Sequence, residues 1–278
     1  MPSFYKSLRF RGVFSLPLTG EVAIKLWNHD GYSIETEWFW RGITGWEAAS
    51  IQIWMKLCAS RAFGPAPVIG DIGACEGIYA LVARALLPGA RVLAVEPLAE
   101  ACQRLNANIL LNKQSMDVFQ AACSDRDGTA ELFVDGQTTS TEASIVTGRM
   151  SHPSASRVVA TRAMSSLIEE LDLRSVDLIK VDVEGAEPEV LKGMGKYLKE
   201  FRPVMILEVL TPEAAEQLNE LMAPLNYSYW DINDDPRNGA LGLKPANRIC
   251  KGVCLNWLIV PTEKVEPLEK CWSDWYLS

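Results

Sequence analysis

The feature that most constrains this chain is a strand–turn–helix–strand unit at residues 68–97. An apolar strand runs into a glycine-rich turn, GDIGACEG at residues 70–77, and a helix then ends near Pro88-Gly89 before a second apolar strand. Glycine supplies the positive φ and the close backbone approach that a direct turn from strand to helix requires. The unit is typical of a nucleotide-binding βαβ motif, in which the ligand lies over the first turn, against the start of the helix.

Acidic residues in this unit indicate which nucleotide it binds. Asp71 ends the first strand, Glu76 lies in the turn, and Glu96 ends the second strand, 19 residues after Gly77. Carboxylates at the turn would repel a dinucleotide pyrophosphate, but they suit the ammonium and sulfonium groups of S-adenosylmethionine (SAM). The position of Glu96 is that of a side chain that binds ribose hydroxyls. The pattern favours SAM, and a plain βα turn with Asp71 as a helix cap is the structural alternative.

Composition and charge exclude several classes of protein. The chain has 278 residues, 48% of them hydrophobic, enough for one large α/β domain with an appendage or for two small domains. Its formal net charge is −8 and it has no run of lysine or arginine, so nucleic acid is not expected as a partner. We find no signal peptide and no apolar run of transmembrane length. We therefore expect no membrane span and a cytoplasmic location.

The seven cysteines favour a reducing compartment, because most of them lie in apolar stretches. Cys58, Cys102 and Cys123 are predicted core residues. Cys250 and Cys254 lack a nearby histidine or second cysteine pair, so buried thiols are favoured there over a zinc site.

The order of elements predicts a doubly wound, mostly parallel α/β sheet, because apolar strands alternate with helices. Residues 1–45 are predicted to form a β-rich appendage or lid, with strands at 9–14, 21–27 and 33–39, in front of a SAM-binding domain at 46–278. Residues 135–157 are predicted to be a long polar loop, and 227–232 and 255–260 an antiparallel hairpin at the sheet edge. Ligands of such sheets bind at the carboxyl ends of the strands.

A second group of charged residues lies in the segment DLIKVDVEGAEPEVLKGM, residues 177–194. Lys180, Asp182 and Glu184 alternate along a predicted strand and would therefore share one face. A lysine and two acids in an apolar strand require mutual pairing. Either Asp182 and Glu184 reach the site of methyl transfer, or the group is a structural ion pair.

Three stretches resemble the FkbM-like family of SAM-dependent methyltransferases: VIGDIGACEGIYA, AACSDRDGTAELF and DLIKVDVEGAEPEVLKG. The resemblance covers roughly residues 45–210. It implies the class I methyltransferase fold, a Rossmann-like seven-stranded sheet whose last strand is antiparallel. It also implies O-methylation of a hydroxyl group on a sugar or other secondary metabolite, with a small molecule or glycan as acceptor.

The resemblance also assigns cofactor contacts to individual positions. Asp71, Gly73 and Gly77, with Ala74 beside them, would hold the methionine end, and Glu96 the ribose. Pro97 and Leu98 would flank the adenine, Ser124 or Asp125 would lie near its amino group, and Asp182 would lie near the transferred methyl. Cys75 and Glu76 depart from the usual family turn, which has asparagine and a small apolar residue there.

Catalysis is expected to rest on Lys180, Asp182 and Glu184, because an alcohol acceptor has a high pKa and needs a base or a metal. His29 and His152 lie in a predicted turn and loop and are expected at the surface. Asp182 and Glu208 end neighbouring strands and could bind Mg²⁺ together, but no third ligand is evident, so a metal site is not expected.

Tryptophan is concentrated near the N-terminus, where five of nine lie in the first 54 residues: 27, 38, 40, 46 and 54. This segment could pack on the core, form a homo-oligomer interface, or close over the acceptor as an aromatic lid. In a lid, Trp40 would stack on the acceptor while Arg41 and Glu47 would add polar contacts, and Glu208 would face it from the sheet.

Two other functions fit the same sheet. An NAD(P)-dependent oxidoreductase is one, although Asp71 and the absence of a Tyr-x-x-x-Lys pair argue against it. A non-catalytic SAM-binding module is the other.

Overall fold

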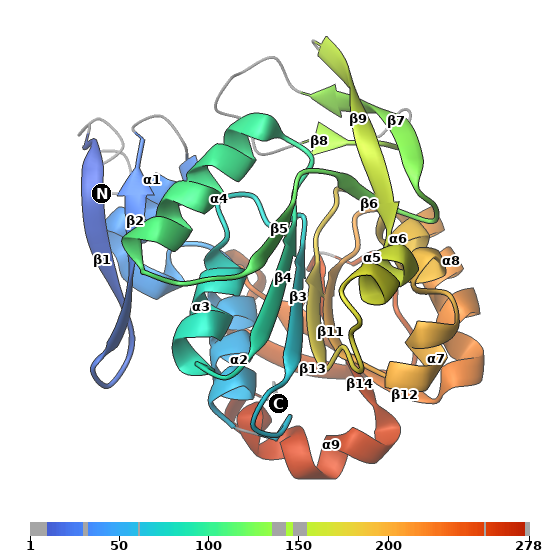
Figure 1. Ribbon diagram of the computed structural model, residues 1–278. Coiled ribbons are helices and arrows are strands. Elements are labelled where there is room, and N and C mark those ends of the chain that lie inside the picture. The colour runs from blue at the N-terminus through green and yellow to red at the C-terminus, as the bar shows by residue number, and fades with distance from the viewer. Residues whose placement is uncertain are drawn as a thin grey trace.

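The computed structural model describes residues 10–29, 33–60, 62–134, 143–146, 155–252 and 254–275. An eight-stranded sheet lies at its centre, in the order β13-β12-β14-β11-β10-β3-β4-β5 (Figure 1). The neighbouring parallel strands are β11 (Val204–Glu208), β10 (Leu178–Val181), β3 (Val68–Ile72), β4 (Arg91–Val95) and β5 (Asp117–Phe119). The predicted α/β fold is therefore confirmed, with a central sheet that is mixed.

The antiparallel end of the sheet differs from the expectation. β14 (Asn256–Pro261) pairs antiparallel with both β11 and β12 (Tyr227–Asn233). The predicted antiparallel pairing of the two late strands is thus correct. However, the outer edge is formed by β13 (Gly242–Ala246), which makes the sheet one strand wider than the expected seven.

Helices cover both faces of the sheet (Figure 1). One face carries α2 (Ala48–Ala59), α3 (Ile78–Leu86) and α4 (Ala99–Leu111). The other carries α5 (Met164–Glu170), α6 (Glu187–Met194), α7 (Lys196–Phe201) and α8 (Pro212–Met222), and α9 (Thr262–Leu268) follows β14. Short 3-10 turns lie at Gly42–Thr44, Ala223–Leu225, Pro236–Asn238, Glu269–Cys271 and Ser273–Trp275. Because both faces are covered, every residue of β3 is buried.

A second sheet of four strands stands at the carboxyl end of the parallel strands (Figure 1). Its order is β6 (Ala122–Ser124), β9 (Ala155–Ala163), β7 (Gly128–Val134) and β8 (Ala143–Ser144). Residues 117–124 are divided between β5 and β6, which belong to different sheets. Much of the predicted polar loop, at 135–142 and 147–154, lies outside the described residues.

The N-terminal segment is a hairpin followed by a helix. β1 (Gly12–Thr19) and β2 (Val22–Asn28) pair antiparallel as expected. The strand predicted at 33–39 is wrong, because these residues form the helix α1 (Ser33–Arg41). Its half-buried Ile34 and buried Trp38 lie one turn apart, and Glu35 and Arg41 suit the two ends of the helix dipole.

The hydrophobic side chains of this segment join the core of the rest of the chain. Leu16, Ile24, Leu26 and Trp38 belong to the same buried cluster as the side chains of α2 and α3. The segment therefore packs against α2 and α3. No helix within the described ranges is both long and apolar enough to cross a bilayer.

Candidate functional site

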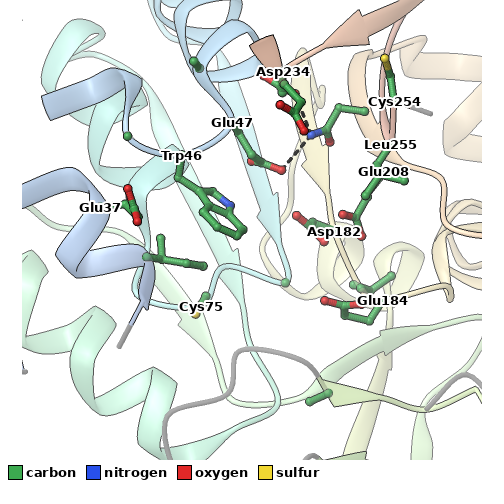
Figure 2. Close-up of a pocket in the computed structure, with 18 of the residues that line it drawn as sticks. Glu37, Trp46, Glu47, Cys75, Asp182, Glu184, Glu208, Asp234, Cys254 and Leu255 are labelled. Carbon is green, nitrogen blue, oxygen red and sulfur yellow. Dashed lines mark hydrogen bonds between the residues drawn. The ribbon is translucent and has the colours of Figure 1, made fainter. Parts of the chain in front are cut away.

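A cavity of about 1050 Å³ opens at the carboxyl ends of β3, β4, β10 and β11. Its wall combines the glycine-rich turn, the ends of these strands, the connection from α1 to α2, and residues 233–241 (Figure 2). This is where a doubly wound sheet binds its ligand, as the sequence predicts.

The glycine-rich turn contacts the segment that follows β10. Gly73 has φ +80°, and a Cβ atom there would lie 1.7 Å from the carbonyl oxygen of Asp182. The Gly73 and Ala74 amides donate to the Val95 carbonyl, at 2.9 and 3.1 Å. Only glycine fits this position, so the turn and the segment around Asp182 have a fixed relative position.

Asp71 supports this turn from behind. Its side chain is 2% exposed, and its Oδ2 accepts a hydrogen bond from the Ala80 amide of α3 at 2.8 Å. Burial raises the pKa of Asp71 to about 7. Gly73 and Cys75 line the cavity, whereas Asp71, Ala74 and Gly77 are not among the described lining residues. Asp71 therefore caps the start of α3, which is the contact that the structural alternative predicts.

Glu96, by contrast, faces the cavity from the end of β4. Its Oε2 accepts from the Cys75 amide and its Oε1 from the Leu98 amide, both at 2.9 Å. Burial raises the pKa of Glu96 to about 7, and these two amides oppose that rise. Each carboxylate oxygen has a second lone pair, so the group can still accept from a ligand hydroxyl.

The next part of the wall differs from the sequence-based assignment. Pro97 lines the cavity, but Leu98 contributes only its amide to Glu96. β6 presents Ala122 and Cys123 there, whereas Ser124 and Asp125 lie just beyond the described lining residues. The sequence offered no way to find Ala122 and Cys123, because small apolar residues carry no chemical signature.

Lys180 and Asp182 form the ion pair that their spacing predicts. The Lys180 Nζ donates to Asp182 Oδ2 at 2.9 Å and to Asn256 Oδ1 at 3.3 Å, and Lys180 is 1% exposed. Burial alone would lower the pKa of Lys180, but the charges of Asp182, Glu47 and Glu208 hold it above its ordinary value. Asp182 lines the cavity and Lys180 does not. The ammonium therefore holds the Asp182 carboxylate in place.

Glu184 reaches the cavity by a different route from the one expected. β10 ends at Val181, so Glu184 does not share a strand face with Lys180. Its backbone turns to φ +56°, and its side chain lines the cavity next to Asp182 (Figure 2).

A network of polar residues on the same wall as Asp182 was only partly foreseen. Glu47 accepts from the Tyr79 hydroxyl at 2.7 Å and from Asn256 Nδ2 at 2.8 Å. Asn256 Nδ2 also donates to Asp234, whose Oδ1 caps α2 by accepting from the Ala49 and Ser50 amides. Asn256 and Asp234 were missed, because they lie far from any motif and reach the site only through the fold.

Burial strongly affects two acids of this wall. It raises the pKa of Glu47, and it raises the pKa of Glu208 well above its ordinary value, with the charge of Asp182 adding to the rise at Glu208. Glu47 and Glu208, both predicted from the sequence, line the cavity.

The aromatic side chain at the cavity is Trp46 and not Trp40. Trp46 and Arg41 line the cavity, and the Trp46 indole projects into it between Glu37 and Asp182 (Figure 2). Trp40 is 38% exposed and packs edge-on against Phe39, outside the described lining residues. The assignment of Trp40 to the acceptor is corrected accordingly.

His29 and four of the seven cysteines are not among the described residues that line the cavity. His29 is bonded to the carboxylate of Glu35, with 3.0 Å between Nδ1 and Oε1, and His152 lies outside the described residues. Cys58, Cys102 and Cys123 are buried free thiols as predicted, but Cys250 is exposed, which contradicts the expectation of a buried pair.

Comparison with known proteins identifies the family. The model of the methyltransferase FkbM domain matches residues 71–229, more than half of the chain. The 2-O-methyltransferase NoeI of Sinorhizobium fredii is 28% identical, over 58% of this chain and 69% of that protein. The AMB antimetabolite synthetase AmbE of Pseudomonas aeruginosa is also 28% identical, over 57% of this chain but only 9% of that protein.

Among solved structures, methyltransferase FkbM from Methylobacillus flagellatus aligns with a TM-score of 0.42 at 15% identity, over 72% of this chain and 47% of that one. On the match of its own sequence to the family model, this chain belongs to the FkbM family of methyltransferases.

Proposed function

We propose that this chain transfers a methyl group from SAM to a hydroxyl of a sugar or other small metabolite. The observation that carries the proposal is Glu96, a cavity-lining carboxylate held by two backbone amides at the end of β4. A carboxylate in this position accepts hydrogen bonds from the hydroxyls of a bound ribose.

The charge of the cavity supports SAM over a phosphate-bearing cofactor. Eight carboxylates line it within the described ranges, against two arginines, Arg41 and Arg237. Such a wall attracts a ligand with an ammonium and a sulfonium and repels a pyrophosphate. Gly73 lets the backbone approach the methionine end, because no side chain stands there.

The size of the cavity supports binding of two ligands. A volume of about 1050 Å³ is at the upper end of the range of small-molecule pockets. The side nearest Gly73, Glu96 and Pro97 would take the cofactor. The side nearest Trp46, Arg41 and Glu208 would take the acceptor.

Methyl transfer needs alignment and an acceptor for one proton. When bound, SAM supplies a sulfonium methyl group: the S–C bond breaks with its electron pair left on sulfur, and a C–O bond forms to the acceptor. Asp182, fixed by Lys180, would orient the acceptor hydroxyl, and Glu184 would take its proton. The activity for which NoeI is named, 2-O-methylation, supports oxygen as the methylated atom.

Calorimetric titration with S-adenosylhomocysteine tests the cofactor assignment. Glu96→Gln is expected to weaken binding at least tenfold, about 1.4 kcal/mol, because the amide cannot accept from both ribose and backbone as the carboxylate does. Glu35→Gln replaces another buried carboxylate that accepts a backbone N–H, and it should bind as the unmodified chain does. Absence of binding by the unmodified chain would overturn the proposal.

A panel of hydroxylated metabolites and glycans, assayed for S-adenosylhomocysteine release, then tests the acceptor class. Methylation of amines alone would contradict oxygen as the acceptor atom.

A further inference from the structure

Three carboxylates from distant parts of the sequence meet on one wall of the cavity. Glu47 precedes α2, Asp182 follows β10, and Glu208 ends β11. One ligand oxygen from each lies within 4.8 Å of the other two. Figure 2 shows the Asp182 and Glu208 carboxylates facing each other, with Glu47 above them.

One oxygen of this group has no partner in the described part of the chain. Glu208 Oε2 is shielded from solvent and accepts no hydrogen bond there. A buried carboxylate oxygen without a donor or cation is costly, and native structures seldom leave one. Glu208 points toward Asp182 (Figure 2), so whatever satisfies this oxygen must lie among the three carboxylates.

The charges nearby are also unbalanced. Lys180 is the ammonium in contact with the group, through Asp182. When all three carboxylates are ionised, as binding of a metal ion requires, they and one ammonium leave two negative charges, which a divalent cation would neutralise. Asp234, whose carboxylate is held by the backbone amides at the start of α2, adds further negative charge beside Glu47.

Neighbouring side chains donate hydrogen bonds to these carboxylates, as the residues around a metal site do to the metal ligands. Tyr79 and Asn256 each donate to one oxygen of Glu47, and Lys180 donates to Asp182 Oδ2. Each of these oxygens has a further lone pair. Such outer hydrogen bonds fix the orientation of metal ligands and strengthen binding.

We propose that Glu47, Asp182 and Glu208 bind a divalent cation of the Mg²⁺ or Mn²⁺ type. Oxygen ligands suit these ions. In an octahedral site at most one pair of the three oxygens lies on opposite sides of Mg²⁺, about 4.2 Å apart, and the other pairs lie about 3 Å apart, so the three carboxylates would have to close around the ion. An octahedral ion would keep about three positions for other oxygens. The acceptor class that fits is a molecule with two neighbouring oxygen atoms, such as a vicinal diol or a hydroxy acid. This role of the ion rests on the proposed function.

Titration of the full chain with Mn²⁺ alone tests the site. Binding is measured by electron paramagnetic resonance, as the loss of the signal of unbound Mn²⁺. The unmodified chain should bind one Mn²⁺ that Mg²⁺ displaces. Glu47→Gln and Glu208→Gln should each weaken binding at least about tenfold. Glu37→Gln, the same change at a carboxylate of the same cavity outside the three, should leave Mn²⁺ binding unaltered.

Glu47→Gln and Glu208→Gln each remove one proposed ligand, so either variant alone is sufficient for the test if the other fails to fold. No Mn²⁺ binding by the folded unmodified chain, or equal binding by the unmodified chain and either folded variant, overturns the site. Titration with S-adenosylhomocysteine on the same samples separates the two proposals. Cofactor binding without Mn²⁺ binding removes only the cation, and Mn²⁺ binding without cofactor binding removes only the proposed methyl donor.

Discussion

At the scale of single residues, the site depends on side chains held in unusual backbone positions. Glu47, Cys75 and Glu184 all line the cavity with positive φ, at +44°, +49° and +56°. A non-glycine residue in this region costs of order 1 kcal/mol or more, and such residues cluster at functional sites. Each turns the chain at the end of an element and directs a side chain into the cavity.

The first residue-scale prediction concerns Trp46. Trp46→Ala should raise the KM of an acceptor found in the panel about three- to tenfold, because an aromatic face in contact with a ligand contributes about 1 kcal/mol. Trp40→Ala should raise KM less, because Trp40 lies outside the lining residues. Steady-state kinetics with both variants provides the measurement, and a larger effect at Trp40 would contradict the assignment.

At the scale of elements, the glycine-rich turn and the segment after β10 act as one unit. Gly73 contacts the Asp182 carbonyl, and Glu187 of α6 accepts from the Val183 and Gly185 amides at 3.1 and 3.2 Å. These contacts join the turn that would hold the cofactor to the acids that would face the acceptor. Under the proposed function, these backbone contacts would set the distance between the cofactor and the acceptor.

Gly73→Ala tests this contact. A Cβ at Gly73 meets the Asp182 carbonyl, and the backbone has φ +80°, so both strain and overlap should destabilise the chain, by about 2 kcal/mol or more. Gly64 has a similar φ, +83°, with nothing within 4 Å of its added Cβ. Gly64→Ala should therefore cost only about 1 kcal/mol. Urea unfolding measures both, and equal losses would show that the contact is unimportant.

At the scale of the whole molecule, several buried carboxylates make stability depend on pH. Burial raises the pKa of Asp71, Glu96 and Glu187 to about 7, and that of Glu35 to about 8. Where folding raises the pKa of an acid, the native state binds more protons than the unfolded state. The stabilisation is then complete below the ordinary pKa and is lost as the pH rises through the native value.

Glu35→Gln isolates one such group. The ordinary pKa is 4.5, so the free energy of unfolding of the unmodified chain should fall between about pH 5.5 and about pH 8. In Glu35→Gln this fall should be smaller by about 1–3 kcal/mol. His29, Arg104 and Glu76 face Glu35 and are present in both proteins. His29 contributes with the opposite sign, because burial lowers its pKa.

A matched control comes from Glu263, whose pKa the Arg202 hydrogen bond lowers to about 2. Its contribution is constant in this pH range, so Glu263→Gln should keep the pH dependence of the unmodified chain. Urea unfolding at the two pH values measures all three proteins. An unchanged slope in Glu35→Gln would contradict the raised pKa.

Local sequence was sufficient where short-range chemistry decides the structure. The βαβ unit, the position of Glu96 and the Lys180–Asp182 pair follow from apolar runs, glycines and alternation over a few residues. The same local pattern misled at 33–39, where aromatic residues suggested a strand. The packing of Trp38 against the core decided for a helix.

By itself, the sequence determined an α/β sheet of parallel strands with acids at the strand ends, because strand and turn propensities act over neighbouring residues. Only the tertiary structure decided which side chains share a wall. Trp46 replaced Trp40 at the cavity. Asn256 bonds both to Glu47, 209 residues away in the sequence, and to Asp234. Glu47 came within ligand distance of Asp182 and Glu208 for the same reason. Such contacts depend on the direction in which packed elements approach each other, and no local pattern encodes that direction.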